Sequence, residues 1–117
     1  MRRIVLLTVV VGLASFGAAC SSTGPSGHTC DSPTKQTEVD MQNMAFTASC
    51  ISATANDTLN LVNKDTTEHT FTVKGTSINV TIEGGQTATA PLTGLAPGTY
   101  SVTCQFHLQM TQTLQVT

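Results

Sequence analysis

The feature that most constrains the fold is an alternation of apolar and polar residues in the middle of the chain. Successive side chains of a strand point to opposite faces of a sheet, so a period of two predicts strands with one buried face. Threonine fills many of the polar positions and suits a pleated surface. No segment carries a convincing helical stripe, which predicts an all-β protein. The alternating apolar residues are Leu59 and Leu61, Phe71 and Val73, and Ile78, Val80 and Ile82.

Pairs of turn-forming residues separate these runs, at positions 56–57, 64–65, 84–85 and 97–98. Several short strands divided by such turns predict an antiparallel sandwich or barrel. We assign residues 37–117 to this domain. Its core is small and would be only marginally stable alone, so a cross-link would help it.

Residues 1–19 are typical of a lipoprotein signal peptide rather than of a folded domain. Two arginines precede a short apolar stretch, and small residues follow it. Cys20 comes directly afterwards and resembles the cysteine of a bacterial lipobox, although Gly17 stands where leucine is more usual. We expect Cys20 to be the lipid-modified first residue of the mature protein; the alternative is an ordinary secretory signal. Both place the chain outside the cytoplasm, at the cell surface or in the periplasm.

Residues 20–36 connect this signal to the domain. They are mostly small and polar, and glycine and proline interrupt them. Such a composition cannot bury enough apolar surface to order itself, so it predicts a flexible tether. With a lipid on Cys20, this tether would hold the domain near a membrane.

The charge pattern excludes one class of partner. Charged residues make up 10% of the chain. Beyond the signal peptide there are only three lysines, compared with all seven acidic residues. No basic patch exists to neutralise phosphates, so we expect no nucleic-acid binding. A protein partner would instead meet a weakly polar surface.

The cysteines predict one cross-link and one unpaired thiol. If Cys20 carries a lipid, three cysteines remain in an oxidising compartment, and one of them must be free, intermolecular or bound to a metal. Cys30 and Cys50 both lie in the N-terminal half. A disulfide between them would attach the tether to the sandwich and stabilise it by about 3 kcal/mol. This assignment leaves Cys104 unpaired.

Cys104 opens a short motif in which His107 and Met110 follow at intervals of three residues. Thiolate, imidazole and thioether form a soft ligand set, and two histidines, one cysteine and a weak axial methionine describe electron-transfer copper sites. His69 is the one further histidine outside the tether. The alternative makes Cys104 a disulfide half, His107 a loop residue and Met110 a core residue. Met44 is predicted to lie in the core rather than to bind a metal.

Two longer motifs resemble the cupredoxins, the family of small blue copper proteins. The segment from Leu95 to Cys104 resembles the family's L-x-P-G-x-Y approach to the copper cysteine, and residues 56–70 resemble its G-D-T…N-x-D…H-T stretch. The spacing of the ligand motif is similar to that of amicyanin. Departures are Leu108, where proline is frequent, Thr70, where an asparagine often braces two loops, and Gln112, which replaces a frequent glycine.

The resemblance implies a Greek-key antiparallel β-sandwich with one type 1 copper bound by His69, Cys104, His107 and Met110. It further implies a monomeric carrier that passes single electrons between a redox protein donor and acceptor. Transient partners would dock on an apolar surface near Phe106, His107 and Leu108. No catalytic base, nucleophile or substrate pocket is evident, so we expect no enzymatic activity. Two alternatives remain open: a copper storage or delivery protein, and a metal-free β-sandwich that serves as a binding module.

Overall fold

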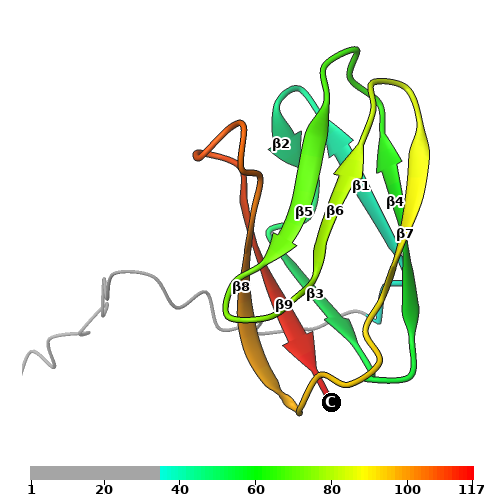
Figure 1. The fold of residues 1–117 in the computed structure, drawn as a ribbon, viewed down its shortest axis with the longest axis vertical. Helices are drawn as coiled ribbons and strands as arrows, with labels where there is room; N and C mark the ends of the chain where they lie inside the picture. Colours follow the sequence, from blue (N-terminus) through cyan, green and yellow to red (C-terminus); the bar gives the residue numbers. More distant parts are fainter. Residues whose placement is uncertain (1–34) are drawn as a thin grey trace, which may run out of the picture.

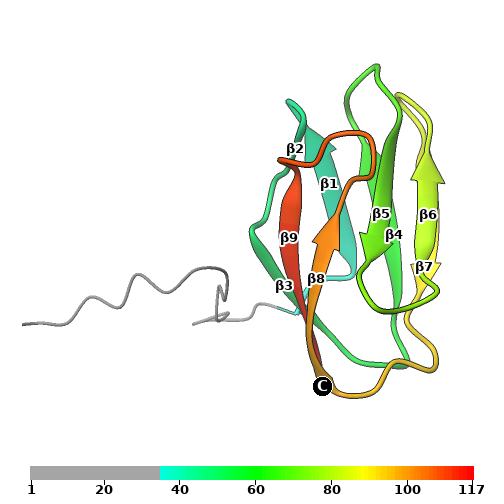
Figure 2. The same cartoon turned by 60° about the vertical axis from the view of Figure 1, so that its left-hand side comes forward.

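The computed structural model describes residues 35–117, which form two β-sheets packed face to face (Figure 1 and Figure 2). The four-stranded sheet has the order β2 (Ala45–Phe46), β1 (Glu38–Gln42), β4 (Thr58–Asn63), β7 (Thr87–Pro91). The five-stranded sheet has the order β3 (Cys50–Ala53), β9 (Thr111–Val116), β8 (Gly98–Thr103), β5 (His69–Val73), β6 (Asn79–Ile82). In this part of the chain, no helix is long and apolar enough to cross a membrane. The predicted all-β sandwich is confirmed.

Strand pairing is mixed, and in this respect the structure differs from the expected antiparallel sandwich. Five of the pairings are antiparallel, but β1 pairs with β4 and β3 pairs with β9 in parallel. The reason is that the chain leaves the first sheet after β2, enters the second as β3, and then returns as β4 beside β1. A strand that returns by such a crossover can run parallel to its neighbour, whereas a tight hairpin forces antiparallel pairing.

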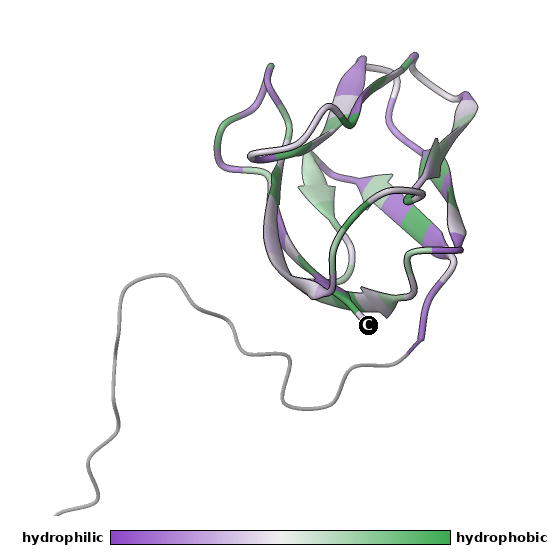
Figure 3. Ribbon diagram, turned by 60° about the horizontal axis from the view of Figure 1, so that its bottom comes forward, coloured by the Kyte–Doolittle hydropathy of each residue, from purple (hydrophilic) through white to green (hydrophobic). Residues whose placement is uncertain are grey.

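The core lies between the sheets and follows the predicted alternation. Leu59 and Leu61 of β4 are fully buried, as are Phe71 and Val73 of β5. Hydrophobic and hydrophilic residues alternate along several strands (Figure 3). The rings of Phe46 and Phe71, one from each sheet, meet edge to face at 6.2 Å between centroids. Each large apolar side chain buried in this way contributes about 1.5–3 kcal/mol.

Two predictions about burial need adjustment. In the third alternating run only Ile82 is buried, while Ile78 and Val80 are partly exposed, because β6 is an edge strand of its sheet. The prediction that Met44 is a core residue is wrong. Met44 lies in the turn between β1 and β2 with a positive φ of 59°, and 37% of it is exposed.

The N-terminal predictions concern residues mostly outside the described range. The signal peptide, Cys20 and Cys30 all precede residue 35. Lys35 pairs in parallel with Ser52 of β3, and the main chain of Gln36 donates to the carbonyl of Ser52. Regular pairing is therefore present as soon as the described chain begins. Cys50 is partly buried at the start of β3.

Candidate metal centre

The candidate ligands extend the rows of side chains that form the core. His69 begins β5 in the same row as Phe71 and Val73. Cys104 directly follows β8 and Met110 directly precedes β9, so each continues the inward-facing row of its strand. β8 and β9 are paired up to Thr103 and Thr111, which brings Cys104 and Met110 opposite each other at this end of the sandwich. The loop that joins β8 to β9 lies at the same end as the start of β5 (Figure 2).

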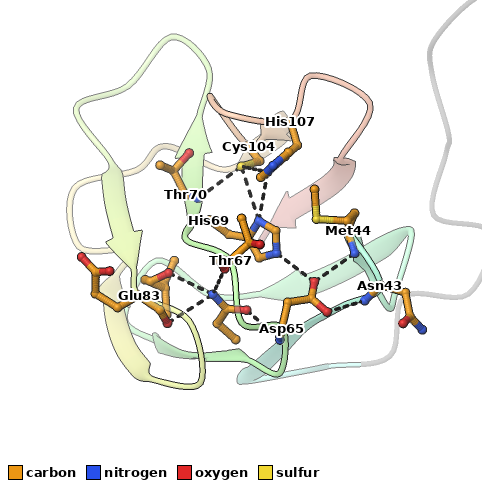
Figure 4. A network of polar contacts seen from close by, with 11 residues as sticks. Asn43, Met44, Asp65, Thr67, His69, Thr70, Glu83, Cys104 and His107 are labelled. Atoms are coloured by element: carbon orange, nitrogen blue, oxygen red, sulfur yellow. Dashed lines mark hydrogen bonds and ion pairs between the residues drawn. The ribbon is translucent and has the colours of Figure 1, made fainter.

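Three of the four predicted ligands converge on one point. His69 Nδ1 lies 3.1 Å from His107 Nδ1, and the sulfur of Cys104 lies 3.9 Å and 3.6 Å from these two nitrogens. Figure 4 shows the three side chains turned toward one another. They form a group whose candidate donor atoms all lie within 4.8 Å of each other. Residues that are 38 positions apart along the chain therefore share one site.

Met110 is the fourth predicted ligand, and main-chain hydrogen bonds hold it at this end of the sandwich. The amide of Cys104 donates to the carbonyl of Met110 at 3.1 Å, and the amide of Met110 donates to the carbonyl of His107 at 2.9 Å. Met110 is only 1% exposed. Its assignment as a thioether ligand stays a prediction.

Thr70 connects the strand that carries His69 to the loop that carries the other ligands. Its amide donates to the sulfur of Cys104 at 3.3 Å, and its hydroxyl accepts a 2.8 Å bond from the amide of Gln105. The same hydroxyl contacts Thr72, which in turn donates to Asn79. A threonine hydroxyl therefore joins the two segments. A sulfur that accepts a hydrogen bond is stabilised as thiolate, the form that binds metals.

Asp65 contacts His69 on the side of the ring away from the other ligands. Its Oδ2 lies 2.9 Å from His69 Nε2. The same carboxylate accepts hydrogen bonds from the amides of Asn43 at 2.7 Å and Met44 at 2.9 Å. The Met44 amide and the His69 ring hold the pKa of the Asp65 carboxyl below its ordinary value, because both favour the charged form.

The loop between β4 and β5 is itself tightly held. Asn63 is buried, and its side-chain amide nitrogen donates to the carbonyls of Thr67, Ile82 and Glu83. Figure 4 shows Thr67 and Glu83 in this network. A Cβ atom on Gly84 would overlap the carbonyl of Thr66, so this position requires glycine. The loop that precedes His69 is thus fixed from both sides before any metal binds.

The opposite edge of the site reaches the surface. His107 is only partly buried, and its neighbours Phe106 and Leu108 are 53% and 78% exposed. Together with Met44, these two are the large hydrophobic residues that are exposed in the described part of the chain. All three lie in the loops at the metal end of the sandwich.

The chemistry of these donors fits a type 1 copper ion. One thiol, two imidazoles with facing Nδ1 atoms and a nearby buried thioether are the soft, nitrogen and sulfur ligands that copper prefers in both oxidation states. Cys104 is the free cysteine of the described residues, as the ligand role requires. Hard ions such as Mg²⁺ or Ca²⁺ would need oxygen ligands, and the three converging side chains offer none.

Sequence reasoning named His69, Cys104 and His107, and the structure brings these three together. It missed Asp65 as a partner of His69, although the two residues are separated by only four positions. The available signal was an acidic residue shortly before a candidate ligand, because ligating histidines commonly donate their second nitrogen to a carboxylate or carbonyl. A surface loop can direct such a residue anywhere, so the signal was weak.

Comparisons with known proteins agree with this fold. Residues 4–116 match the model of the cupredoxin-like domain. Amicyanin from Paracoccus versutus (Thiobacillus versutus) shares the fold with a TM-score of 0.59 and 19% identity, over 75% of this chain and 87% of amicyanin. A copper-containing nitrite reductase from Thermus scotoductus SA-01 gives a TM-score of 0.60 and 19% identity, over 70% of this chain and 22% of the reductase. No curated protein sequence matches the chain.

Proposed function

Because the chain belongs to the family of cupredoxin-like domains, we propose that it is a small blue copper protein that transfers single electrons. Its ligands are His69, Cys104, His107 and Met110. The observation that carries this proposal is the convergence of two imidazole nitrogens and one free thiol at the end of the sandwich. A copper ion held by such ligands exchanges one electron between its Cu(I) and Cu(II) states.

The residues of the chain contribute a prearranged and partly dry site. His69 and Cys104 are fully buried, whereas His107 is partly exposed. The amide of Thr70 donates a hydrogen bond to the sulfur of Cys104. Asp65 and Thr70 hold the ligands in place from opposite sides. Little rearrangement is then needed when the charge of the site changes, which favours rapid electron transfer.

Partners of this carrier dock near His107. The exposed side chains of Phe106 and Leu108 flank this ligand, and Met44 is exposed on an adjacent turn. Exposed apolar residues concentrated at one end of a molecule mark an interaction site. Small and transient interfaces are typical of redox partners, which must separate after each transfer. The proposed partners are a donor and an acceptor protein that approach this end in turn.

The proposed location is outside the cytoplasm, with a lipid on Cys20 and a disulfide between Cys30 and Cys50. The sequence of residues 1–19 motivates the first part. The main-chain pairing of Lys35 with Ser52 supports the disulfide, because it brings the start of the described chain beside β3, two residues from Cys50. Peptide mapping without reduction tests the disulfide. A bridge from Cys104 to either cysteine would contradict both the disulfide and the metal site.

Copper delivery is the second candidate function. The observation in its favour is the partial exposure of His107, which gives an acceptor protein access to one ligand. The two functions differ in how the protein releases its ion. An electron carrier retains copper through many redox cycles, whereas a delivery protein surrenders Cu(I) to an acceptor.

Two measurements test the proposal. Native mass spectrometry of the purified protein should find one copper per chain, and the oxidised protein should show intense visible absorption from a copper–thiolate bond. Protein-film voltammetry should give a reversible one-electron wave with slow loss of copper. A protein that contains no copper and takes up none would contradict both functions and leave a metal-free binding module. A protein that transfers Cu(I) readily to a chelating acceptor would favour delivery.

A further inference from the structure

The carboxylate of Asp65 accepts hydrogen bonds from three donors. Oδ1 accepts from the amide of Asn43, and Oδ2 accepts from the amide of Met44 and faces Nε2 of His69. The side chain of Asp65 is 16% exposed, and the ring of His69 is fully buried. Figure 4 shows Asp65 between the turn that carries Met44 and the ring of His69.

This contact determines which nitrogen of His69 carries the hydrogen. An ionised carboxylate has no hydrogen to donate, so the 2.9 Å contact requires that Nε2 of His69 is the donor. In the neutral ring, Nδ1 then presents its lone pair. That lone pair points toward Cys104 and His107, where the other candidate donor atoms lie.

The same carboxylate stabilises an unusual turn. Asn43 and Met44 both have left-handed backbone conformations, with φ of 56° and 59°. This conformation is unfavourable for residues other than glycine and persists only where surrounding contacts hold it. Both amides of this pair donate to Asp65, one to each oxygen. The turn and the ring of His69 therefore depend on one side chain.

We propose that Asp65 is a positioning residue for the metal site, which holds the ring of His69 in its binding orientation with the hydrogen on Nε2. This inference rests on the proposed function, because it concerns one of the proposed copper ligands. Asp65 does not contact the metal itself. It acts by removing the freedom of His69 to rotate or to present the wrong nitrogen.

Three variants test the proposal. Asp65→Ala removes the carboxylate. Asp65→Asn can keep the bond to His69, because an amide oxygen in the place of Oδ2 still accepts from both Met44 and His69, whereas its NH2 group, in the place of Oδ1, no longer accepts from the amide of Asn43. Asp57→Ala is the matched control. The Asp57 carboxylate also lies in a turn and accepts a hydrogen bond from a main-chain amide, that of Thr54, at 2.7 Å, and this bond likewise lowers its pKa. Asp57 lies in the turn between β3 and β4 and contacts none of the candidate ligands.

The first measurement uses the metal-free protein. The Nε2 proton of His69, observed by ¹H–¹⁵N NMR, should resonate furthest downfield in the wild type and the Asp57→Ala variant. It should move upfield in Asp65→Asn, whose acceptor is neutral, and further upfield in Asp65→Ala. An unchanged resonance in Asp65→Ala would show that this carboxylate does not hold the ring.

The second measurement is the affinity for Co(II), titrated into the metal-free protein and followed by its visible absorption. Loss of a residue that orients a ligating histidine typically lowers metal affinity about 10–100-fold. We expect a loss of this size in Asp65→Ala, a smaller loss in Asp65→Asn and no loss in Asp57→Ala. Equal losses in the two alanine variants would mean that Asp65 has only a general structural role. If the wild type binds neither copper nor Co(II), the proposed function fails. The chemical shifts of the Nε2 proton would still test whether Asp65 orients the ring of His69.

Discussion

The two histidines of the metal centre have the same side chain in opposite surroundings. His69 begins a central strand, is fully buried and contacts a carboxylate through its second nitrogen. His107 lies in the loop between β8 and β9, is partly exposed and stands between two of the most exposed apolar residues of the domain. Their Nδ1 atoms nevertheless approach to 3.1 Å.

The two ligands of one site therefore differ in role: neighbouring residues hold one of them in place, and the other is exposed to solvent. The segment before His69 is held by Asn63, Asp65 and the close packing of Gly84, so this ligand is rigid. The loop around His107 presents Phe106 and Leu108 to solvent, so this ligand is accessible to a partner. For the proposed electron transfer, a rigid ligand would keep the geometry of the site constant, and an exposed ligand would shorten the path of the electron to a partner.

The largest expected effect is that of removing the thiol of Cys104, which lies close to both histidines. Cys104→Ser should abolish the visible absorption of the copper protein completely, because a serine hydroxyl is a poor ligand for copper at neutral pH. The sandwich should still fold, which far-ultraviolet circular dichroism would check. Retained absorption in this variant would place the copper thiolate elsewhere and remove the basis of the comparison.

Removing each histidine in turn tests whether burial distinguishes the two ligands. His107→Gly should regain the visible absorption when copper and free imidazole are added, because its ligand position is open to solvent. His69→Gly should require at least roughly tenfold more imidazole, a difference of about 1.4 kcal/mol, because its position is closed. Equal rescue of the two variants would show that burial does not distinguish them.

Replacing Met110 should change the potential rather than the occupancy of the site. A glutamine offers a harder oxygen that favours Cu(II), so Met110→Gln should lower the reduction potential. Met110→Leu offers no axial ligand and should raise it. The exchange to leucine conserves volume and should cost less than about 1.5 kcal/mol of stability. Protein-film voltammetry of the three proteins in one buffer checks the order, and three equal potentials would make Met110 a core residue only.

The smallest expected effect on the visible spectrum concerns the link between the two histidine-bearing segments. Thr70→Val keeps the shape of the side chain but removes the hydroxyl that accepts from Gln105. The unfolding free energy should fall by about 1–3 kcal/mol if that amide loses its partner, and by less if water reaches it. Urea denaturation of the metal-free protein measures this change. The amide of Thr70 still donates to Cys104, so the visible spectrum should shift only slightly.

Much of the fold followed from local pattern. The alternation at Leu59 and Leu61 and at Phe71 and Val73 correctly identified two central strands, because period-two burial is a property of any strand with one face in a core. The parallel pairing of β1 with β4 did not follow from it. Alternation shows that a residue faces inward, but it does not tell which strand lies beside it or in which direction that strand runs.

The exposure of Met44 was mispredicted for a related reason. An apolar side chain in a short strand-like run usually belongs to the core, but here the run is interrupted by a left-handed turn. That turn depends on Asp65, which is 21 positions away in the sequence. A contact between such distant residues has no local signature.

The sequence by itself determined the chemistry of the site. Cys104, His107 and Met110 lie within one short connection between paired strands, so any fold that forms this hairpin keeps them together, and their side chains prefer soft metals whatever surrounds them. The sequence named His69 as a ligand but could not place it; the fold brings its ring to the other ligands, sets Asp65 beside it and leaves His107 partly exposed. Those outcomes depend on the register that pairs β5 with β8 and on the packing of one sheet against the other. Both arise from long-range contacts, which form only when the whole sandwich folds.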